Sequence, residues 1–275
     1  MSALQSALLG WAERARRDLP WRRTRDPWAV LVSEVMLQQT QVVRVIPRYE
    51  AFLGRFPTPA ACAAAPLAEV VRLWAGLGYN RRALSLHRAA RAVVDGGGFP
   101  DTLAGLSALP GLGPYTARAV LAFAFERDVA VLDANARRVL SRALGAAVTQ
   151  EAADALVPRG LGWAWNQGVL DLGALVCRPR PRCHACPLAG ACAWHWSGRE
   201  PPDPWPRGRP QTRFHGSDRQ GRGRLVAVLR ERSLAWEEVP TATGWPDDPD
   251  RAEAVARALI AEGLVVAEGG RLRLP

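Results

Sequence analysis

The chain has 275 residues, 48% hydrophobic and 23% charged, which is typical of a globular protein with roughly two or three modules and argues against extensive disorder. Its formal net charge of +10 favours a polyanionic partner, such as nucleic acid or an acidic membrane surface. All of its basic side chains are arginine, because the sequence contains no lysine. Schiff-base catalysis by a lysine amine is therefore excluded.

The N-terminal stretch MSALQSALLGWAERARRDLPW predicts a short amphipathic helix with a charged end. It lacks the basic start and the small-residue cleavage site of a secretory signal peptide. No apolar run in the sequence approaches the roughly 20 residues that a membrane-spanning helix needs. We therefore expect a cytoplasmic protein without a membrane partner, associated with the nucleoid if it binds DNA.

The region up to about residue 195 is predicted to be helical. Apolar side chains recur at helical spacing in five segments, separated by proline- and glycine-rich turns: 28–46, 67–75, 83–94, 114–125 and 136–144. Sustained strand alternation occurs only near the C-terminus. The sequence thus predicts a mainly α protein whose first 195 residues form the catalytic region.

The C-terminal part is predicted to be a separate small module. Residues 196–213 are rich in proline and arginine, which indicates a linker. Residues 214–275 contain two predicted helices, 222–232 and 250–263, and then a two-stranded turn with Gly269 and Gly270 at its tip. This order is compatible with a winged-helix-like α/β module, and packing or partner binding explains it as well as DNA binding does.

Four of the five cysteines lie in the stretch CRPRPRCHACPLAGAC, as Cys177, Cys183, Cys186 and Cys192. In a chain without a secretion signal, this spacing fits a metal site or an iron–sulfur cluster better than disulfides. Four thiolates in one loop suit either zinc or a [4Fe–4S] cluster, and the spacing alone does not decide between them. Cys62, in an alanine-rich run, is expected to be a small core residue.

The stretch ALPGLGPYTARAVLAFAF carries an L-P-G-x-G turn directly before a predicted helix. Gly111 and Gly113 allow the backbone there to approach an anion at the helix N-terminus. The pattern is similar to a helix-hairpin-helix, which grips a DNA phosphate through backbone N–H groups without recognising sequence. A glycine turn that only joins two helices is the alternative.

Two carboxylates have positions that suit glycosidic chemistry. Asp133 follows an apolar run and precedes a helix, so it is predicted to be an N-cap that stays ionised and can stabilise a developing cation. Glu34 lies in the largely apolar run WAVLVSEVMLQQTQV, so partial burial, a raised pKa and a general-acid role are expected. An acid and a carboxylate facing one substrate can cleave a glycosidic bond. A plain helix cap and a solvated glutamate are the alternatives.

Together, SEVMLQQTQV, GLGYN, LPGLGPYTA, LDANARRVLSR and the four-cysteine loop closely resemble the MutY family, adenine DNA glycosylases of the helix-hairpin-helix superfamily. The resemblance spans roughly residues 18–195. It implies a helix-hairpin-helix glycosylase fold, with a six-helix domain at about 25–131 and an iron–sulfur domain formed by 1–24 and 132–195. It also implies a monomeric enzyme of base excision repair that removes adenine mispaired with 8-oxoguanine or guanine from double-stranded DNA.

The resemblance assigns roles by position. It implies that Glu34 protonates the adenine ring, that Asp133 stabilises the sugar cation and that Asn135 lies near this aspartate. Tyr115 occupies the place of the Schiff-base lysine of related endonuclease III enzymes, so efficient lyase activity is not expected. The remaining matches imply an adenine pocket of Trp21, Arg22, Leu37 and Gln167, base-stack residues Gln39 and Tyr79, phosphate contacts at Arg178, Arg180 and Arg182, and a [4Fe–4S] cluster on Cys177, Cys183, Cys186 and Cys192.

The sequence also departs from the family pattern. The first cysteine gap has five residues where the family usually has six, Ala134 replaces the usual glycine after Asp133, and Asn80 replaces a frequent tyrosine. Residues 214–275 are too short for the Nudix-like domain with which the family recognises 8-oxoguanine.

Two other hypotheses remain. One is a glycosylase of the same superfamily for thymine or oxidised pyrimidines, which would not be expected to carry Glu34 within SEVMLQQT. The other is a non-enzymatic iron–sulfur, winged-helix DNA-binding regulator. That hypothesis leaves the two carboxylates and the hairpin without an explanation.

Overall fold

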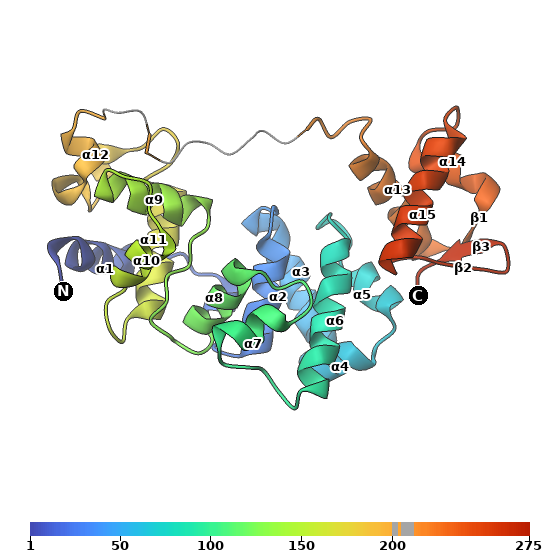
Figure 1. The fold of residues 1–275 in the computed structure, drawn as a ribbon, viewed down its shortest axis with the longest axis horizontal. Coiled ribbons are helices and arrows are strands. Elements are labelled where there is room, and N and C mark those ends of the chain that lie inside the picture. The colour runs from blue at the N-terminus through green and yellow to red at the C-terminus, as the bar shows by residue number, and fades with distance from the viewer. Residues whose placement is uncertain (200–202, 205–211) are drawn as a thin grey trace. The chain divides into compact units, whose positions relative to one another are not determined.

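The computed structural model describes residues 1–199, 203–204 and 212–275 and confirms the predicted mainly α fold (Figure 1). Most of the predicted linker 196–213 lies outside the described residues. The chain divides into two units. Unit 1 comprises Met1–Val30, Asp101–Ser107 and Gly113–Arg209, and unit 2 comprises Leu31–Pro100, Ala108–Leu112 and Pro210–Pro275. The domain boundaries suggested by the resemblance stay a prediction.

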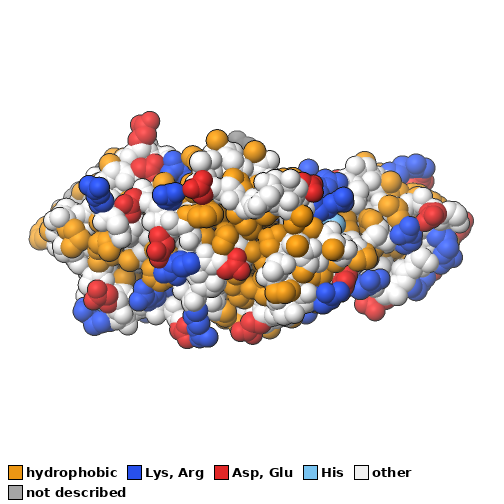
Figure 2. Space-filling view, turned by 90° about the horizontal axis from the view of Figure 1, so that it is seen from below, with side chains coloured by type: hydrophobic (Ala, Val, Ile, Leu, Met, Phe, Trp, Pro, Cys, Tyr) orange, Lys and Arg blue, Asp and Glu red, His pale blue; other side chains and the backbone are white. Residues whose placement is uncertain are grey.

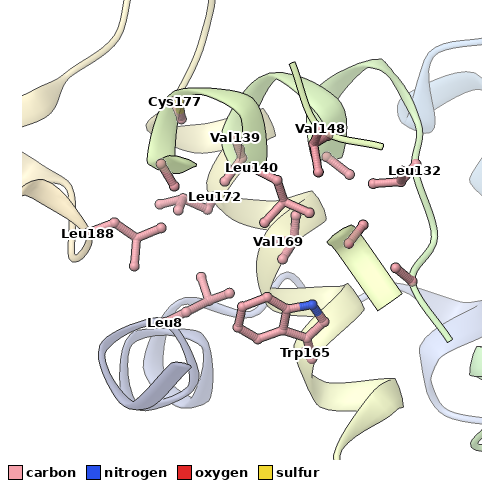
Figure 3. Packing of buried hydrophobic residues seen from close by; sticks show 14 of the residues in the cluster. Leu8, Leu132, Val139, Leu140, Val148, Trp165, Val169, Leu172, Cys177 and Leu188 are labelled. Atoms are coloured by element: carbon pink, nitrogen blue, oxygen red, sulfur yellow. The ribbon is translucent and has the colours of Figure 1, made fainter. Parts of the chain in front are cut away.

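Unit 1 is built around one long buried helix. Its helices are α1 (Ala3–Ala15), α8 (Pro114–Phe123), α9 (Ala134–Leu144), α10 (Gln150–Ala155), α11 (Gly162–Leu175) and α12 (Ala193–Trp196). Figure 3 shows Leu8 of α1 and Leu140 of α9 lying around Trp165 and Val169 of α11. Helix α1 approaches α11 closely at Gly168, where an added Cβ atom would lie 3.0 Å from the Ala12 side chain.

Unit 2 contains the helices α3 (Val42–Arg55), α4 (Pro59–Ala64), α5 (Leu67–Leu73) and α6 (Arg81–Asp95). Two further helices cross between the units along the chain, α2 (Pro27–Leu37) and α7 (Leu103–Ala108). The single helical segment predicted at 28–46 is wrong, because α2 ends at Leu37 and α3 begins at Val42. The chain reverses at Gln39, which has a left-handed φ of 56°.

The C-terminal module of unit 2 contains α13 (Asp218–Glu231), α14 (Val239–Thr243) and α15 (Pro249–Glu262). Strands β1 (Leu234–Ala235), β2 (Val266–Glu268) and β3 (Arg271–Arg273) form an antiparallel sheet in the order β1-β3-β2. Leu272 of β3 is fully buried, as are Leu225 of α13 and Leu234 of β1. The two predicted helices and the turn at Gly269–Gly270 are confirmed, and β1 and α14 were not predicted.

Charge is distributed rather than concentrated on the face seen in Figure 2, where basic and acidic side chains alternate around hydrophobic ones. Within the described part of the chain, no helix is both long enough and apolar enough to cross a membrane. The net charge of +10 is therefore not gathered into one basic patch on this face.

Candidate functional site

The predicted site residues fall into two groups, one in each unit. Unit 1 contains Trp21, Arg22, Gly113, Tyr115, Asp133, Asn135, Gln167, the three loop arginines and the four loop cysteines. Unit 2 contains Glu34, Leu37, Gln39, Tyr79 and Gly111.

Asp133 is the N-cap of α9, as the sequence predicts. Its Oδ1 atom accepts a hydrogen bond of 2.6 Å from the backbone N–H of Ala136, and its Oδ2 atom accepts one of 3.2 Å from the Asn135 amide. Burial raises the pKa of Asp133, and the donors of Ala136 and Asn135 act against this rise. The hydrogen bonds at the start of α9 therefore favour the ionised form of Asp133, as the sequence predicts, and burial opposes them with the larger effect on its pKa.

Asn135 links Asp133 to a cation. While its amide nitrogen donates to Asp133, its Oδ1 atom accepts a hydrogen bond of 2.7 Å from Arg138, which fixes the orientation of the amide. The same guanidinium group donates to the carbonyls of Gly173 and Cys177. Gly173 is required here, because a Cβ atom at this position would lie 2.7 Å from the Asn135 side chain. Helices α9 and α11 thus hold the Asp133 carboxylate in one orientation.

Three predicted adenine-pocket residues of unit 1 are buried: Trp21, Arg22 and Gln167. Arg22 forms a bidentate ion pair with the fully buried Asp171, with N–O distances of 2.7 and 2.9 Å. Arg17 donates to the same carboxylate. Burial acts to raise the pKa of Asp171, but the two arginines outweigh it and leave this pKa below its ordinary value. The guanidinium group of Arg22 therefore binds Asp171 and the carbonyl of Arg17, directly after Trp21 in the chain.

The four loop cysteines line one small pocket of unit 1, together with Arg142, Leu188 and His195. Burial raises the pKa of the Cys177 and Cys192 thiols and raises the pKa of Cys186 to about 11. Within the described residues, no three histidine, cysteine or acidic side chains are grouped as ligands of a single metal ion. The pocket therefore brings the predicted thiol ligands together without defining their ligand geometry.

Arg142 holds the cysteine loop in place. Its guanidinium group donates to the carbonyls of Arg178 and Pro179, contacts the Cys177 Sγ atom at 3.5 Å and pairs with Asp203. Its Nε atom and the Nδ1 atom of His195 are both buried and lack a hydrogen-bond partner in the described part of the chain. Two nitrogen atoms that can donate hydrogen bonds therefore remain available at the pocket that the cysteines line.

The arginines between the cysteines lie on the surface. The side chains of Arg178, Arg180 and Arg182 are exposed, and Arg178 donates from Nε to the carbonyl of Ala174. The arginines around the loop are therefore of two kinds. Arg142 is buried and supports the loop, whereas the three loop arginines face solvent, where they can reach an anionic partner.

In unit 2, Glu34 lies on α2 and is only 7% exposed. Its neighbours Leu31, Val35 and Met36 are buried, which confirms the burial that the apolar run predicts. Leu37, the last residue of α2, is half-buried. A buried carboxyl group is the kind of group that can act as a general acid.

Arg82 connects the end of α2 to the loop before α6. Its guanidinium group donates to six oxygen atoms, five of them backbone carbonyls, of Val35, Met36, Gln38, Thr40, Leu77 and Gly78. Burial lowers the pKa of Arg82 to about 10. This arginine holds together the segments that contain Gln39 and Tyr79. Both of these residues have left-handed backbones, with φ values of 56° and 46°, a conformation that costs free energy in a non-glycine residue.

Glycine occurs at the two positions of the predicted hairpin, 111 and 113, for different structural reasons. Gly111 in unit 2 has a φ of 79°, and a Cβ atom there would lie 2.4 Å from the Ser85 side chain. Gly113 in unit 1 is the N-cap of α8, and apart from its chain neighbours no described residue comes within 4 Å of the place of its Cβ. Tyr115, one residue into that helix after Pro114, is half-buried. The fold therefore requires Gly111, whereas Gly113 leaves open space for a ligand.

Sequence analysis missed several functional residues, all of which act by supporting others: Arg82, Arg138, Arg142 and Asp171. Asp171 had a usable signal, because it lies in the apolar run GVLDLGALV just as Glu34 lies in its own. The three arginines had none, because their acceptors are backbone carbonyls and side chains from distant segments.

Comparison with known proteins places these features in context. Residues 32–157 match the family described as HhH-GPD superfamily base excision DNA repair protein. A protein of Mycobacterium tuberculosis (strain CDC 1551 / Oshkosh) named adenine DNA glycosylase is 42% identical over 283 residues, covering 98% of this chain and 92% of that protein. The Homo sapiens protein of the same name is 43% identical over 214 residues, covering 70% of this chain and 39% of that protein.

Solved structures show the same fold. A thermostable thymine-DNA glycosylase superimposes with a TM-score of 0.66 and 33% identity, covering 70% of this chain and 94% of that one. An endonuclease III in a non-covalent complex with DNA gives a TM-score of 0.62 at 21% identity, covering 72% of this chain and 98% of that one. The second likeness supports the fold alone.

Proposed function

Because the chain belongs to the adenine DNA glycosylases of the HhH-GPD superfamily, we propose that it hydrolyses the N-glycosidic bond of adenine mispaired with 8-oxoguanine or guanine in double-stranded DNA. The observation that carries this proposal is the fixed orientation of the Asp133 carboxylate by Ala136 and Asn135. A carboxylate in a preorganised position stabilises the oxocarbenium-like sugar cation that forms as adenine leaves.

In the proposed mechanism, the target adenine is extruded from the duplex. The resemblance assigns its recognition to Trp21, Arg22, Leu37 and Gln167. Glu34, buried on α2, protonates the adenine ring and makes it a better leaving group. Asp133 stabilises the sugar cation, water attacks the cation, and the products are free adenine and an abasic site. Asn135 is a positioning residue that acts through Asp133.

The proposed reaction ends with the abasic site and does not continue to cleavage of the DNA strand. Strand cleavage by a lyase requires an amine that attacks the sugar carbon, and the chain contains no lysine. Tyr115 lies on α8, and the resemblance assigns to it the place of the Schiff-base lysine of endonuclease III enzymes; its side chain has no amine. The enzyme is therefore proposed to be a monofunctional glycosylase without efficient lyase activity.

A [4Fe–4S] cluster on Cys177, Cys183, Cys186 and Cys192 is part of the proposal. Two features of unit 1 fit it. The four thiols line one pocket, and Arg142 and His195, which line the same pocket, each have a buried nitrogen atom without a hydrogen-bond partner in the described part of the chain. The sulfides and cysteine thiolates of a cluster accept hydrogen bonds from such nitrogen atoms, and a zinc ion on the same cysteines would offer the thiolates alone. When bound, the cluster supplies a rigid centre for the loop. Arg142 then orients that loop.

Double-stranded DNA is proposed to contact both units. Arg178, Arg180 and Arg182 are exposed and suited to phosphate oxygens, and the open space at Gly113 lets a phosphate approach the N-terminus of α8. Gln39 and Tyr79 are proposed to enter the base stack beside the mispair. The protein is proposed to act as a monomer in the cytoplasm, at the nucleoid.

Single-turnover cleavage tests this function. Duplexes that carry adenine opposite 8-oxoguanine, guanine or thymine, and thymine opposite guanine, are incubated with the wild-type protein and with Glu34→Gln. We expect adenine release opposite 8-oxoguanine and guanine only, strand breaks only after alkali, and a loss of at least about 100-fold in rate for Glu34→Gln. Release of thymine without release of adenine would instead assign the chain to the activity in the name of its thymine-DNA glycosylase neighbour.

A further inference from the structure

The C-terminal module contains a groove of about 460 Å³ that none of the functions proposed above uses. Its walls come from the 3₁₀ turn Trp236–Glu238, from α14 and from α15 (Figure 1). The module contacts α5 through other residues, Arg230 and Pro275. All the residues that line the groove belong to the module: Trp236, Glu237, Val239, Pro240, Pro249, Glu253 and Arg257. The groove is therefore complete within unit 2.

Local contacts hold the walls of the groove. The Glu238 carboxylate accepts a hydrogen bond of 2.8 Å from the backbone N–H of Ala235 and pairs with Arg232 at 2.7 Å. Pro240 and Pro249 lie in the first turns of α14 and α15, where the proline ring fixes the backbone φ. We therefore expect the walls to keep their shape when a ligand enters, which lowers the free-energy cost of binding.

One arginine of the module shows which chemical group these walls bind. The guanidinium carbon of Arg257 lies over the Trp236 ring, 5.3 Å from its centre, and its Nε atom donates to Glu253 at 2.6 Å. An aromatic face beside a carboxylate attracts a guanidinium group through both its charge and its planar shape. The Arg257 side chain is 69% exposed, and an exposed ion pair contributes little stability. Another guanidinium group can therefore displace Arg257 at a small cost.

The charge around the groove disfavours DNA as its ligand. Residues 236–253 contain six acidic residues and one arginine, in a chain whose net charge is +10. Glu237 lines the groove, is exposed and forms no ion pair within the described part of the chain. These carboxylates repel phosphate groups and attract cationic side chains. A basic segment of a protein is the macromolecular ligand whose charge is complementary.

We propose that this groove binds an arginine side chain of a partner protein, in the place that Arg257 occupies in the free chain. The partner's guanidinium group stacks on Trp236 and pairs with Glu253, and a neighbouring cation of the partner pairs with Glu237. Arginine is favoured over lysine, because its planar group stacks on an aromatic ring and binds a carboxylate through two N–H donors. No residue of the groove takes part in the proposed glycosylase mechanism, so the proposal goes beyond that function.

The test follows the indole N–H signal of Trp236 by two-dimensional NMR of the ¹⁵N-labelled full-length protein. Its signal is identified by its absence in Trp236→Phe. The probes are two capped peptides of equal length, one with two adjacent arginines between glycines and one with two lysines in their place. We expect the arginine peptide to shift the Trp236 signal in a saturable manner. It should bind at least about threefold more tightly than the lysine peptide.

Arg257→Ala has a matched control in Arg273→Ala. Arg257 pairs with Glu253 and lines the groove. Arg273 pairs with Glu268 in the same module and is not among the described residues that line the groove. Each substitution removes one positive charge and frees one exposed carboxylate. We expect Arg257→Ala to strengthen binding of the arginine peptide about threefold more than the control does, because it vacates the Trp236 ring.

Glu237→Gln tests the second contact of the ligand. Its control is Glu231→Gln, which removes the same charge from an exposed residue of the module outside the groove. We expect Glu237→Gln to weaken binding of the arginine peptide about threefold and the control to change it by less than about 1.5-fold. The Trp236 signal reports binding in both variants, and thermal melting verifies that each is folded.

Three results would overturn the proposal. The first is a Trp236 signal that the arginine peptide does not move. The second is equal affinity for the arginine and lysine peptides, which attraction between opposite charges alone would produce. The third is Arg257→Ala binding no more tightly than Arg273→Ala. None of these measurements includes DNA, so a failure of the proposed glycosylase function would leave the assignment of the groove unaffected.

Discussion

The two units satisfy the guanidinium groups of Arg22 and Arg82 in opposite ways. In unit 1, Arg22 pairs with the fully buried Asp171, a carboxylate that Arg17 also contacts. In unit 2, Arg82 has no carboxylate partner in the described part of the chain and is surrounded by backbone carbonyls. Each guanidinium group holds a segment with candidate site residues, Trp21 in unit 1 and Gln39 and Tyr79 in unit 2.

This difference has a physical consequence. A buried ion pair contains a group that titrates, and removal of one partner leaves an uncompensated buried charge. Backbone carbonyls do not titrate, so the Arg82 network should be insensitive to acid, and its loss leaves only neutral acceptors without donors. An arginine can therefore hold a site segment in place with a stability contribution that depends on pH, as in unit 1, or with one that does not, as in unit 2.

The largest expected effect is on the ion pair. Arg22→Met should lower the free energy of unfolding by about 3–5 kcal/mol, because it leaves Asp171 charged and buried with Arg17 alone. Arg23→Ala is the control, since this neighbouring arginine forms a surface ion pair with Asp18 and should cost less than about 1 kcal/mol. Denaturant titration at neutral pH measures both. Equal losses in the two variants would show that the buried pair contributes nothing special.

A smaller loss, about 2–3 kcal/mol, is expected for Arg82→Met, because several carbonyls near the end of α2 lose their donor. The control is Arg81→Ala, whose side chain is exposed, with an expected change within about 0.5 kcal/mol. Denaturant titration again measures the difference. If Arg82→Met is as stable as its control, the carbonyl network does not hold the loop.

The hairpin glycines allow the same substitution, glycine to alanine, to be compared in the two units. Gly111→Ala should cost about 2 kcal/mol, because it combines a left-handed backbone with a clash against Ser85. Gly113→Ala should cost less than about 1 kcal/mol, because its φ is −85° and the space around it is open. Thermal unfolding distinguishes them, and a reversed order would contradict the assigned roles.

Lowering the pH should change the stability contribution of Arg22 but not that of Arg82. We expect this change to be smaller than the effect of removing either side chain. The ion pairs leave the pKa of Asp171 below its ordinary value, so the stability that they contribute is present above that ordinary value and is lost as pH falls through the folded-state pKa. The stability difference between wild type and Arg22→Met should therefore shrink as pH falls. The difference between wild type and Arg82→Met should stay constant, and denaturant titrations across this pH range test both statements.

The smallest effect on stability is expected for Asp133→Asn. Burial raises the pKa of Asp133, so the folded state favours its neutral form, and the charged carboxylate at neutral pH costs stability. Asparagine is as good an N-cap as aspartate. The variant should therefore be as stable as the wild type or slightly more stable by thermal unfolding, and a clear loss of stability would contradict the assigned burial effect.

Some of this architecture could be predicted from the sequence. The mainly α fold, the family and the C-terminal turn at Gly269–Gly270 are confirmed, because glycines, caps and apolar spacing are local signals. The break after α2 could not be predicted, because Gln38–Gln41 contain neither glycine nor proline. The hydrogen bond to the Gln38 carbonyl, next to the left-handed Gln39, comes from Arg82, which is distant in the sequence. Helix α11 was also missed, because it is buried on most sides and so shows no amphipathic period.

In the candidate site, too, local features could be predicted from the sequence and distant contacts could not. The capping role of Asp133 and the burial of Glu34 are visible in their local sequence, and the structure confirms both. The supports of these residues are not visible in it, because the Asn135–Arg138 link and the carbonyls of Gly173 and Cys177 meet only when α9 packs on α11. Residue types therefore predicted the chemistry, and tertiary contacts decided its orientation.

The most direct test of the account is the rate of adenine release by Asp133→Asn in single turnover, on a duplex with adenine opposite 8-oxoguanine. We predict a rate at least about 1,000-fold below that of the wild type, with affinity for a duplex that carries an abasic-site analogue unchanged within about threefold and stability preserved. Adenine release within about tenfold of the wild-type rate would contradict the account, because the preorganised carboxylate at the start of α9 would then not be what stabilises the sugar cation.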